Sequence, residues 1–187
     1  MRFHYGGKHS DDSQLVRKPD PDGSVMFKEP DDLKKMAVRM NIISLVILVV
    51  LLAAINITNE DFKVSFPGMF LFILSMVPHE FLHGLCFKED VTMYTNLSKF
   101  MLFVYGTEDF SKTRFILMSL CPNIIFGMIP LILYFLFPQY ASLGTLGALA
   151  FSAGAGDYVN VFHALTEVPN GAKVYCNGIH TYWYKTE

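Results

Sequence analysis

The chain has 187 residues, of which 52% are hydrophobic and only 17% are charged. Soluble domains carry about 25% charged residues, and the apolar residues here are gathered in long runs, which indicates a membrane protein. The formal net charge of -2 is small, and because no basic stripe is present, the sequence excludes nucleic acid as a partner.

The chain begins with a polar segment, residues 1–36, which is rich in Asp, Lys and Pro. It contains neither the apolar core nor the small-residue cleavage site of a signal peptide. We interpret it as a cytoplasmic tail, followed by an uncleaved membrane anchor. The three cysteines have no short spacing, so the sequence supports neither a disulfide framework nor a cysteine zinc cluster.

Four apolar segments are long enough to cross a bilayer core of about 30 Å, which takes about 20 helical residues. They are residues 37–57, 67–87, 115–137 and 142–165. Residues 37–165 are therefore predicted to form one four-helix transmembrane domain, with residues 166–187 as a cytoplasmic C-terminal tail. The fourth segment is rich in Gly and Ala at helical spacings, which predicts a helix in the middle of the bundle.

A short stretch between the second and third segments has a different pattern. Two β-prone runs, residues 91–95 and 100–105, flank a polar break at residues 96–99 and predict a β-hairpin. The predicted fold class is thus an all-α membrane protein with four transmembrane helices and one short cytoplasmic hairpin.

The basic residues predict the orientation in the membrane. Eight of them lie between Arg2 and Arg39, whereas the connection after the first predicted span holds only Lys63 and the turn at 138–141 holds none. Basic loops stay in the cytoplasm. The sequence therefore predicts an integral membrane protein with both termini cytoplasmic.

The residues with the clearest chemistry are His79, Glu80 and His83, in the order His-Glu-Phe-Leu-His. On a helix, positions i and i+4 share one face, so both imidazoles can reach one metal ion. The glutamate beside the first histidine can take a proton from a metal-activated water. The alternative is a pair of hydrogen-bonded core histidines, but three ionisable groups in an apolar span are costly unless they are paired, hydrated or bound to metal.

A catalytic zinc site needs a third protein ligand. Asp157 is the only acid in the fourth segment. Asp157 and the midpoint of the two histidines each lie about four residues to the cytoplasmic side of the middle of their predicted spans. At 1.5 Å per residue, both are roughly 6 Å from the centre of the membrane, so their depths match. One alternative is that Asp157 is a helix-end acid paired with a cation or water, and another is that Glu89 is the third ligand in its place. His163 lies nearer the membrane surface and is interpreted as an interfacial histidine.

Prolines add a second signal. Pro78 cannot donate to the carbonyl of Leu74, and Pro122 likewise frees a carbonyl in the third segment. Irregular backbone at membrane depth is tolerated where it lines a cavity or is covered by protein. Asn123, beside Pro122, is a candidate to bind substrate or the oxyanion, and an interhelical polar contact is an equal alternative.

These motifs resemble the DUF3267 family of membrane-embedded zincin peptidases, which is related to the site-2 proteases. The similarity covers residues 78–84 (Pro-His-Glu-Phe-Leu-His-Gly), 111–114, 121–122, 156–157, 169–172 and 180–184. The resemblance implies a Zn²⁺ cofactor, an aspartate third ligand at Asp157 and a bacterial plasma membrane. Here Gly-Asp-Tyr stands where site-2 proteases have Leu-Asp-Gly.

The sequence therefore predicts a zinc metalloendopeptidase that cleaves membrane proteins or peptides in or next to transmembrane segments. Zinc would be held by His79, His83 and Asp157, with Glu80 as the base. Two alternatives stay open. A non-catalytic zinc scaffold or chaperone would need a fourth protein ligand, and a metal transporter would need ionisable groups along a path across the membrane.

Overall fold

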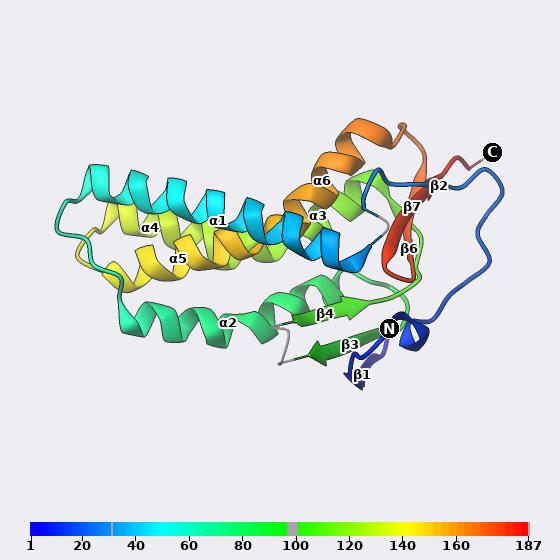
Figure 1. The fold of residues 1–187 in the computed structure, drawn as a ribbon, viewed down its shortest axis with the longest axis horizontal. Helices are drawn as coiled ribbons and strands as arrows, with labels where there is room; N and C mark the ends of the chain where they lie inside the picture. Colours follow the sequence, from blue (N-terminus) through cyan, green and yellow to red (C-terminus); the bar gives the residue numbers. More distant parts are fainter. Residues whose placement is uncertain (31, 97–100, 187) are drawn as a thin grey trace.

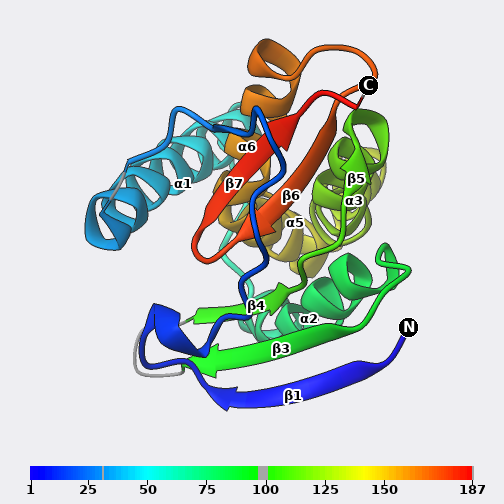
Figure 2. The same cartoon turned by 90° about the vertical axis from the view of Figure 1, so that its right-hand side faces the viewer.

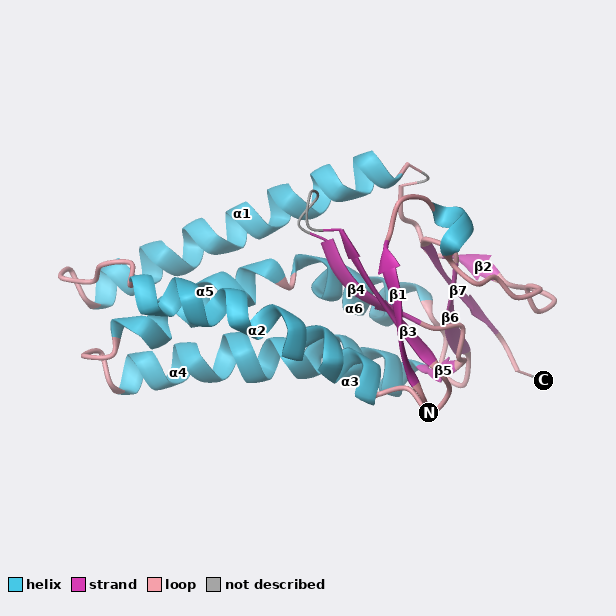
Figure 3. Ribbon diagram, turned by 90° about the horizontal axis from the view of Figure 1, so that it is seen from below, coloured by secondary structure: helices cyan, strands magenta, loops and turns pink. Residues whose placement is uncertain are grey.

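The computed structural model describes residues 1–30, 32–96 and 101–186. The long helices lie side by side, and two β-sheets cover one end of them (Figure 1). Both chain termini lie at this sheet end, as the view from below also shows (Figure 3). The opposite end consists of two short connections between helices.

The helical part contains three long passes and a fourth that is broken. α1 is Leu33–Thr58, α2 is Phe66–Leu85, and the third pass joins α3 (Lys112–Asn123), a π-helical turn η3 (Ile124–Met128) and α4 (Ile129–Leu136). The fourth pass consists of α5 (Ala141–Ala153) and α6 (Ala155–Glu167), with Gly154 between them. Side-chain caps from Asp32, Ser65 and Ser111 begin α1, α2 and α3.

Two sheets form at the other end of the molecule, and both combine distant parts of the chain (Figure 2). In the first, β1 (Phe3–Lys8) pairs parallel with β3 (Val91–Asn96), which pairs antiparallel with β4 (Met101–Tyr105). In the second, the order is β2 (Val25–Met26), β7 (His180–Tyr184), β6 (Lys173–Asn177) and β5 (Phe110–Ser111), and all pairs are antiparallel.

The predicted all-α, four-span fold is wrong in two respects. Residues 1–36 and 166–187, expected to be polar tails, supply strands to both sheets. Among the described residues, three helices are long and apolar enough to cross a membrane, Lys34–Thr58, Phe66–Leu85 and Lys112–Leu136. The expected fourth span at 142–165 is interrupted at Gly154, which leaves α5 as a shorter apolar helix. The predicted hairpin is present as β3 and β4, but its turn at residues 97–100 lies outside the described residues.

The prediction that the Gly- and Ala-rich helix lies centrally is confirmed. α5 packs against α1, α2, η3 and α4. Its small residues allow this close approach: a Cβ added to Gly147 would lie 2.7 Å from the backbone nitrogen of Leu131. α1, by contrast, exposes large apolar side chains along most of its length, as expected of a helix that faces lipid.

A partly buried ion pair fixes the C-terminal end of α2. Arg114, in the first turn of α3, donates two hydrogen bonds to the carbonyl oxygen of Cys86, which caps α2. It also pairs with Glu108, whose side chain accepts hydrogen bonds from the backbone N–H groups of Lys88 and Glu89. These contacts hold the end of α2 against the start of α3.

The charge of Glu108 depends on these partners. Burial opposes its ionisation, but hydrogen bonds from Arg114 and from the two backbone N–H groups outweigh burial and lower the pKa of the carboxyl. Because the pKa is lower in the folded chain, this stabilisation is present above the usual carboxyl pKa of about 4.3 and is lost as the pH falls through the lower folded value.

We expect Arg114→Met to lower the free energy of unfolding in detergent by about 3 kcal/mol, because it leaves the Glu108 carboxylate buried without its cation. Lys88→Met is the matched control, since the Lys88 side chain is exposed and only its backbone N–H joins the cluster. We expect a change within about 0.5 kcal/mol for this control. Equal losses in the two variants, measured by denaturant unfolding, would contradict a role for the ion pair.

Candidate metal centre

The helix α2 brings three potential metal ligands to one place. His79, Glu80 and His83 each offer a ligand atom within 4.8 Å of the others. The two imidazole rings lie 5.0 Å apart between centroids, as expected for positions i and i+4 on one helical face. Both histidine side chains are largely covered, with 16% and 11% of their surface exposed.

A second helix adds a carboxylate to this group. Asp157, in the first turn of α6, places Oδ2 3.6 Å from His79 Nε2 and Oδ1 3.4 Å from His83 Nε2. The alternatives of the sequence lie elsewhere: Glu89 is exposed and donates its backbone N–H to Glu108, while the buried His163 pairs with Glu167. Of Asp157, Glu89 and His163, only Asp157 meets the two histidines.

Both contacts between Asp157 and the histidines are longer than direct hydrogen bonds and are close to the spacing of two ligands around one ion. Ordinary N–H···O bonds measure about 2.7–3.2 Å, and both contacts of Asp157 are longer. Ligand atoms placed tetrahedrally at about 2.0–2.1 Å from zinc lie about 3.3 Å from one another. Two imidazoles and one carboxylate are also a donor set that zinc accepts. The residues present therefore fit a zinc ion.

The orientation of His83 is set by a proline on another helix. Pro122 in α3 has no N–H, so the carbonyl of Met118, four residues earlier, has no partner within the helix. His83 Nδ1 lies 3.0 Å from this oxygen and can donate to it, which leaves Nε2 as the nitrogen that faces Asp157. A hydrogen bond on the far side of a ligating histidine fixes both its tautomer and its ring direction.

Asn123 holds Asp157 from the other side. Its amide nitrogen donates to Asp157 Oδ2 over 2.7 Å and to the carbonyl of Ser119 over 2.9 Å. Asn123 can approach because position 154 is glycine, where a Cβ would lie only 1.8 Å from Asn123 Oδ1. The gap between α5 and α6 thus admits the side chain that orients the carboxylate.

Glu80 faces the first sheet. Its Oε2 accepts a hydrogen bond from the backbone N–H of Val104 in β4, at 3.2 Å. Beside it, a cavity of about 190 Å³ opens between α2, α5 and β4 and is lined by Phe72, Ser75, Met76, His79, Glu80, Leu102, Ala150 and Ala153. The sequence did not predict that Glu80 would bind the Val104 N–H or that His83 would bind the Met118 carbonyl. Only Pro122 indicated that a carbonyl one turn earlier would lack its helical partner.

Comparison with known proteins agrees with this geometry. A sequence profile of the DUF3267 family, described as "Putative zincin peptidase", matches residues 72–173, more than half of the chain. The chain belongs to the DUF3267 family. The match includes all four residues of the site, and membership supports a zinc-dependent peptidase. No curated protein and no solved structure matches the chain. In this DUF3267 member, β1, α1 and β7 lie outside the matched region.

Pro122→Ala restores a backbone N–H that competes with His83 for the Met118 carbonyl. Loss of such an outer hydrogen bond weakens metal affinity by about 10–100-fold, so we expect the zinc Kd to rise at least tenfold. Removal of a helical proline should not lower the Tm of the zinc-free protein. Pro130→Ala, at the start of α4, is the matched control and should leave the Kd unchanged. Equal zinc affinity in the two variants, measured by chelator competition, would refute this role of Pro122.

Proposed function

We propose that this protein is a membrane-embedded zinc metalloendopeptidase that hydrolyses peptide bonds in or next to transmembrane segments. One observation carries the proposal: Asp157 of α6 lies 3.4 and 3.6 Å from the Nε2 atoms of the histidine pair on α2. Membership of a zincin peptidase family and three helices long enough to span a membrane support it.

In this proposal His79, His83 and Asp157 hold the metal, and Glu80 is the general base. Zinc held by these residues would supply Lewis acidity, which would lower the pKa of a water molecule and polarise the peptide carbonyl. Glu80 takes the proton of that water and later gives it to the leaving amine. Its present partner, the N–H of Val104, keeps the carboxylate at the edge of β4, beside the cavity in which a peptide can lie.

We assign Asn123 a positioning role. The oxyanion role considered from the sequence requires a free amide N–H, and in the structure this nitrogen donates to both Asp157 and Ser119. Asn123 would therefore act through Asp157, by holding one carboxylate oxygen so that the other can reach the metal. Backbone or metal would then stabilise the tetrahedral intermediate.

The substrate would be a segment unwound from a membrane helix, because an intact helix hides its carbonyls in its own hydrogen bonds. The Val104 N–H points to Glu80 and away from β3, so this side of β4 is an open edge. An extended peptide can pair with such an edge through its main chain. The edge lies beside the metal ligands and would bring a peptide carbonyl toward them.

The charge distribution supports an orientation. The two connections at the end away from the sheets, residues 59–65 and 137–140, hold a single basic residue, Lys63. Among the described residues, most other Lys and Arg residues lie in the N-terminal segment, at the starts of α1 and α3 and in the C-terminal segment. These parts are at the sheet end, so we propose that this end faces the cytoplasm and carries both termini. The membrane would be a bacterial plasma membrane, as the family resemblance implies.

One observation favours a second candidate, a non-catalytic zinc scaffold. Structural zinc sites are closed by four protein ligands, and Glu80 lies close enough to the histidines to offer a fourth. In that case Glu80 would hold the metal and would not activate water. The two candidates therefore differ in what they require of this one carboxylate.

Glu80→Gln separates them. If Glu80 is the base, we expect cleavage of transmembrane-segment peptides to fall by about 10²–10⁴-fold, with zinc content unchanged. Glu89→Gln is the matched control, because Glu89 is exposed and its carboxylate is outside the site. An active Glu80→Gln protein would refute the base assignment. Wild-type protein that binds zinc and cleaves none of the peptides would favour the scaffold.

The ligand assignment has its own test, which needs no substrate. We expect His79→Ala and Asp157→Asn each to weaken zinc binding by more than the roughly 100-fold typical of outer contacts. His163→Ala is the control, since this buried histidine pairs with Glu167 away from the site. Metal analysis of the detergent-purified proteins measures the effect, and an Asp157→Asn protein with full zinc content would exclude Asp157 as a ligand.

A further inference from the structure

A second, larger cavity of about 280 Å³ lies at the sheet end of the metal centre. Its walls come from β4, α6, the start of α1, the N-terminal segment and the turn between β6 and β7. Most of these wall residues lie outside residues 72–173, the part that matches the DUF3267 family. The cavity is therefore largely built from segments outside the family-matched region.

The cavity adjoins the metal centre at two points. Val104 lines it, and the backbone N–H of the same residue binds Glu80. Gly156 also lines it and directly precedes Asp157. A peptide paired with the edge of β4 and presented to the metal would thus pass the mouth of this cavity. The smaller cavity, beside His79, is lined by Leu102 of β4, whereas the larger one is lined by residues 103–105 of the same strand.

The walls are mainly apolar. Met36 and Met40 of α1, Phe103 of β4, Val159 of α6 and Ile179 of the β6–β7 turn face the space. A cavity of about 150 Å³ holds a benzene molecule, so about 280 Å³ has room for a large aliphatic or aromatic side chain.

The polar side chains in the walls include Arg39, which is exposed and keeps its charge, together with Glu29 and Cys176. Burial raises the pKa of Cys176 to about 11, so its thiol stays neutral. Burial also raises the pKa of Glu29, although a hydrogen bond from the Thr181 N–H opposes this shift. The Arg39 guanidinium disfavours a cationic occupant, and the remaining walls are mainly apolar.

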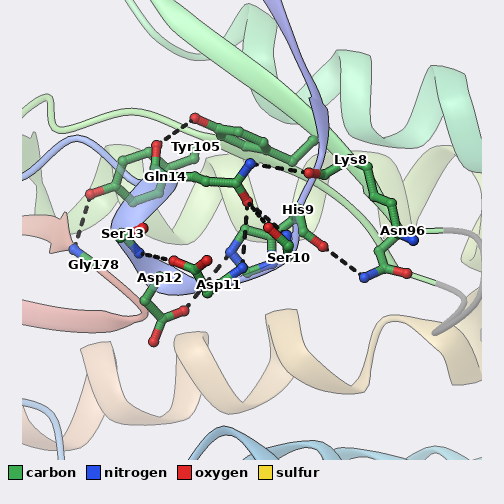
Figure 4. Close-up of polar contacts among 11 residues, drawn as sticks. Lys8, His9, Ser10, Asp11, Asp12, Ser13, Gln14, Asn96, Tyr105 and Gly178 are labelled. Carbon is green, nitrogen blue, oxygen red and sulfur yellow. Dashed lines mark hydrogen bonds and ion pairs between the residues drawn. The ribbon is translucent and has the colours of Figure 1, made fainter.

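His9 forms a rigid part of the cavity wall. His9 is 3% exposed, and its Nε2 has no hydrogen-bond partner among the described residues. The residue is held firmly: its carbonyl accepts from Asn96, its N–H donates to Thr95, and its ring packs on Phe103 (Figure 4 shows the contact with Asn96). Its nearest charged neighbour is Asp12, 3.8 Å away.

From these observations we infer that this cavity is a specificity pocket, which receives a large apolar side chain (Leu, Met or Phe) of the peptide substrate close to the scissile bond. The inference rests on the proposed peptidase function and adds which sequences the enzyme selects. Selection would be made by the N-terminal segment, α1 and the C-terminal hairpin, while the family-matched core supplies the metal ligands.

The test uses the full chain in detergent, a proteome-derived peptide library and mass spectrometry of the cleaved positions. We expect the wild type to prefer Leu, Met or Phe at one position flanking the cut. Met40→Trp in α1 and Ile179→Trp in the β6–β7 turn each fill the pocket from a different element. Each should lower the ratio of kcat/KM for Leu to kcat/KM for Ala at that position by about tenfold or more. Zinc content should stay unchanged in both.

Val46→Trp is the control on the same helix, because Val46 is 57% exposed on the outer face of α1. It should keep the wild-type preference. Pocket variants that cleave with wild-type preference would overturn the pocket and leave the peptidase function standing. A zinc-loaded wild type that cleaves no peptide would overturn the function and the pocket together.

Discussion

One contact, between Nδ1 of His83 and the carbonyl oxygen of Met118, fixes how the two halves of the site face each other. Both groups lie in an apolar bundle, where a polar atom without a partner is costly. Pro122 leaves the carbonyl free, and His83 has one ring nitrogen available because the other faces Asp157. Each group satisfies the other, so α2 and α3 keep one relative position.

The absence of a side chain at Gly154 positions the proposed third ligand, Asp157. Gly154 ends α5 and leaves space for Asn123, which in turn holds Asp157 at the start of α6. An unbroken helix with a larger residue at position 154 would displace Asn123 and release the carboxylate. The break in the fourth pass therefore allows a central packing helix to be followed by a turn that presents Asp157 to the histidines.

The sequence predicted features that are local or periodic, and missed those that join distant segments. The spacing of His79 and His83 places them on one helical face, and matching depths led to Asp157, which the structure places beside them. The sheets could not be predicted in this way. β1 pairs with β3 across more than 80 residues, and β2 has only two residues, too few to show an alternating pattern. Pro122 signalled a free carbonyl, but only the fold shows which side chain uses it.

The position of the site reconciles two opposing demands. Hydrolysis needs water and ionised groups, which the bilayer core disfavours, whereas a membrane-helix substrate is stable only in that core. The ligands lie where α2 and the broken fourth pass reach the sheets, so the bundle and the polar end of the molecule meet at the metal. There the edge of β4 can replace the hydrogen bonds that a substrate helix loses as it unwinds. In the proposed reaction the sheets would therefore take part in the chemistry, because without such an edge a peptide bond near the bilayer would stay hidden inside its helix.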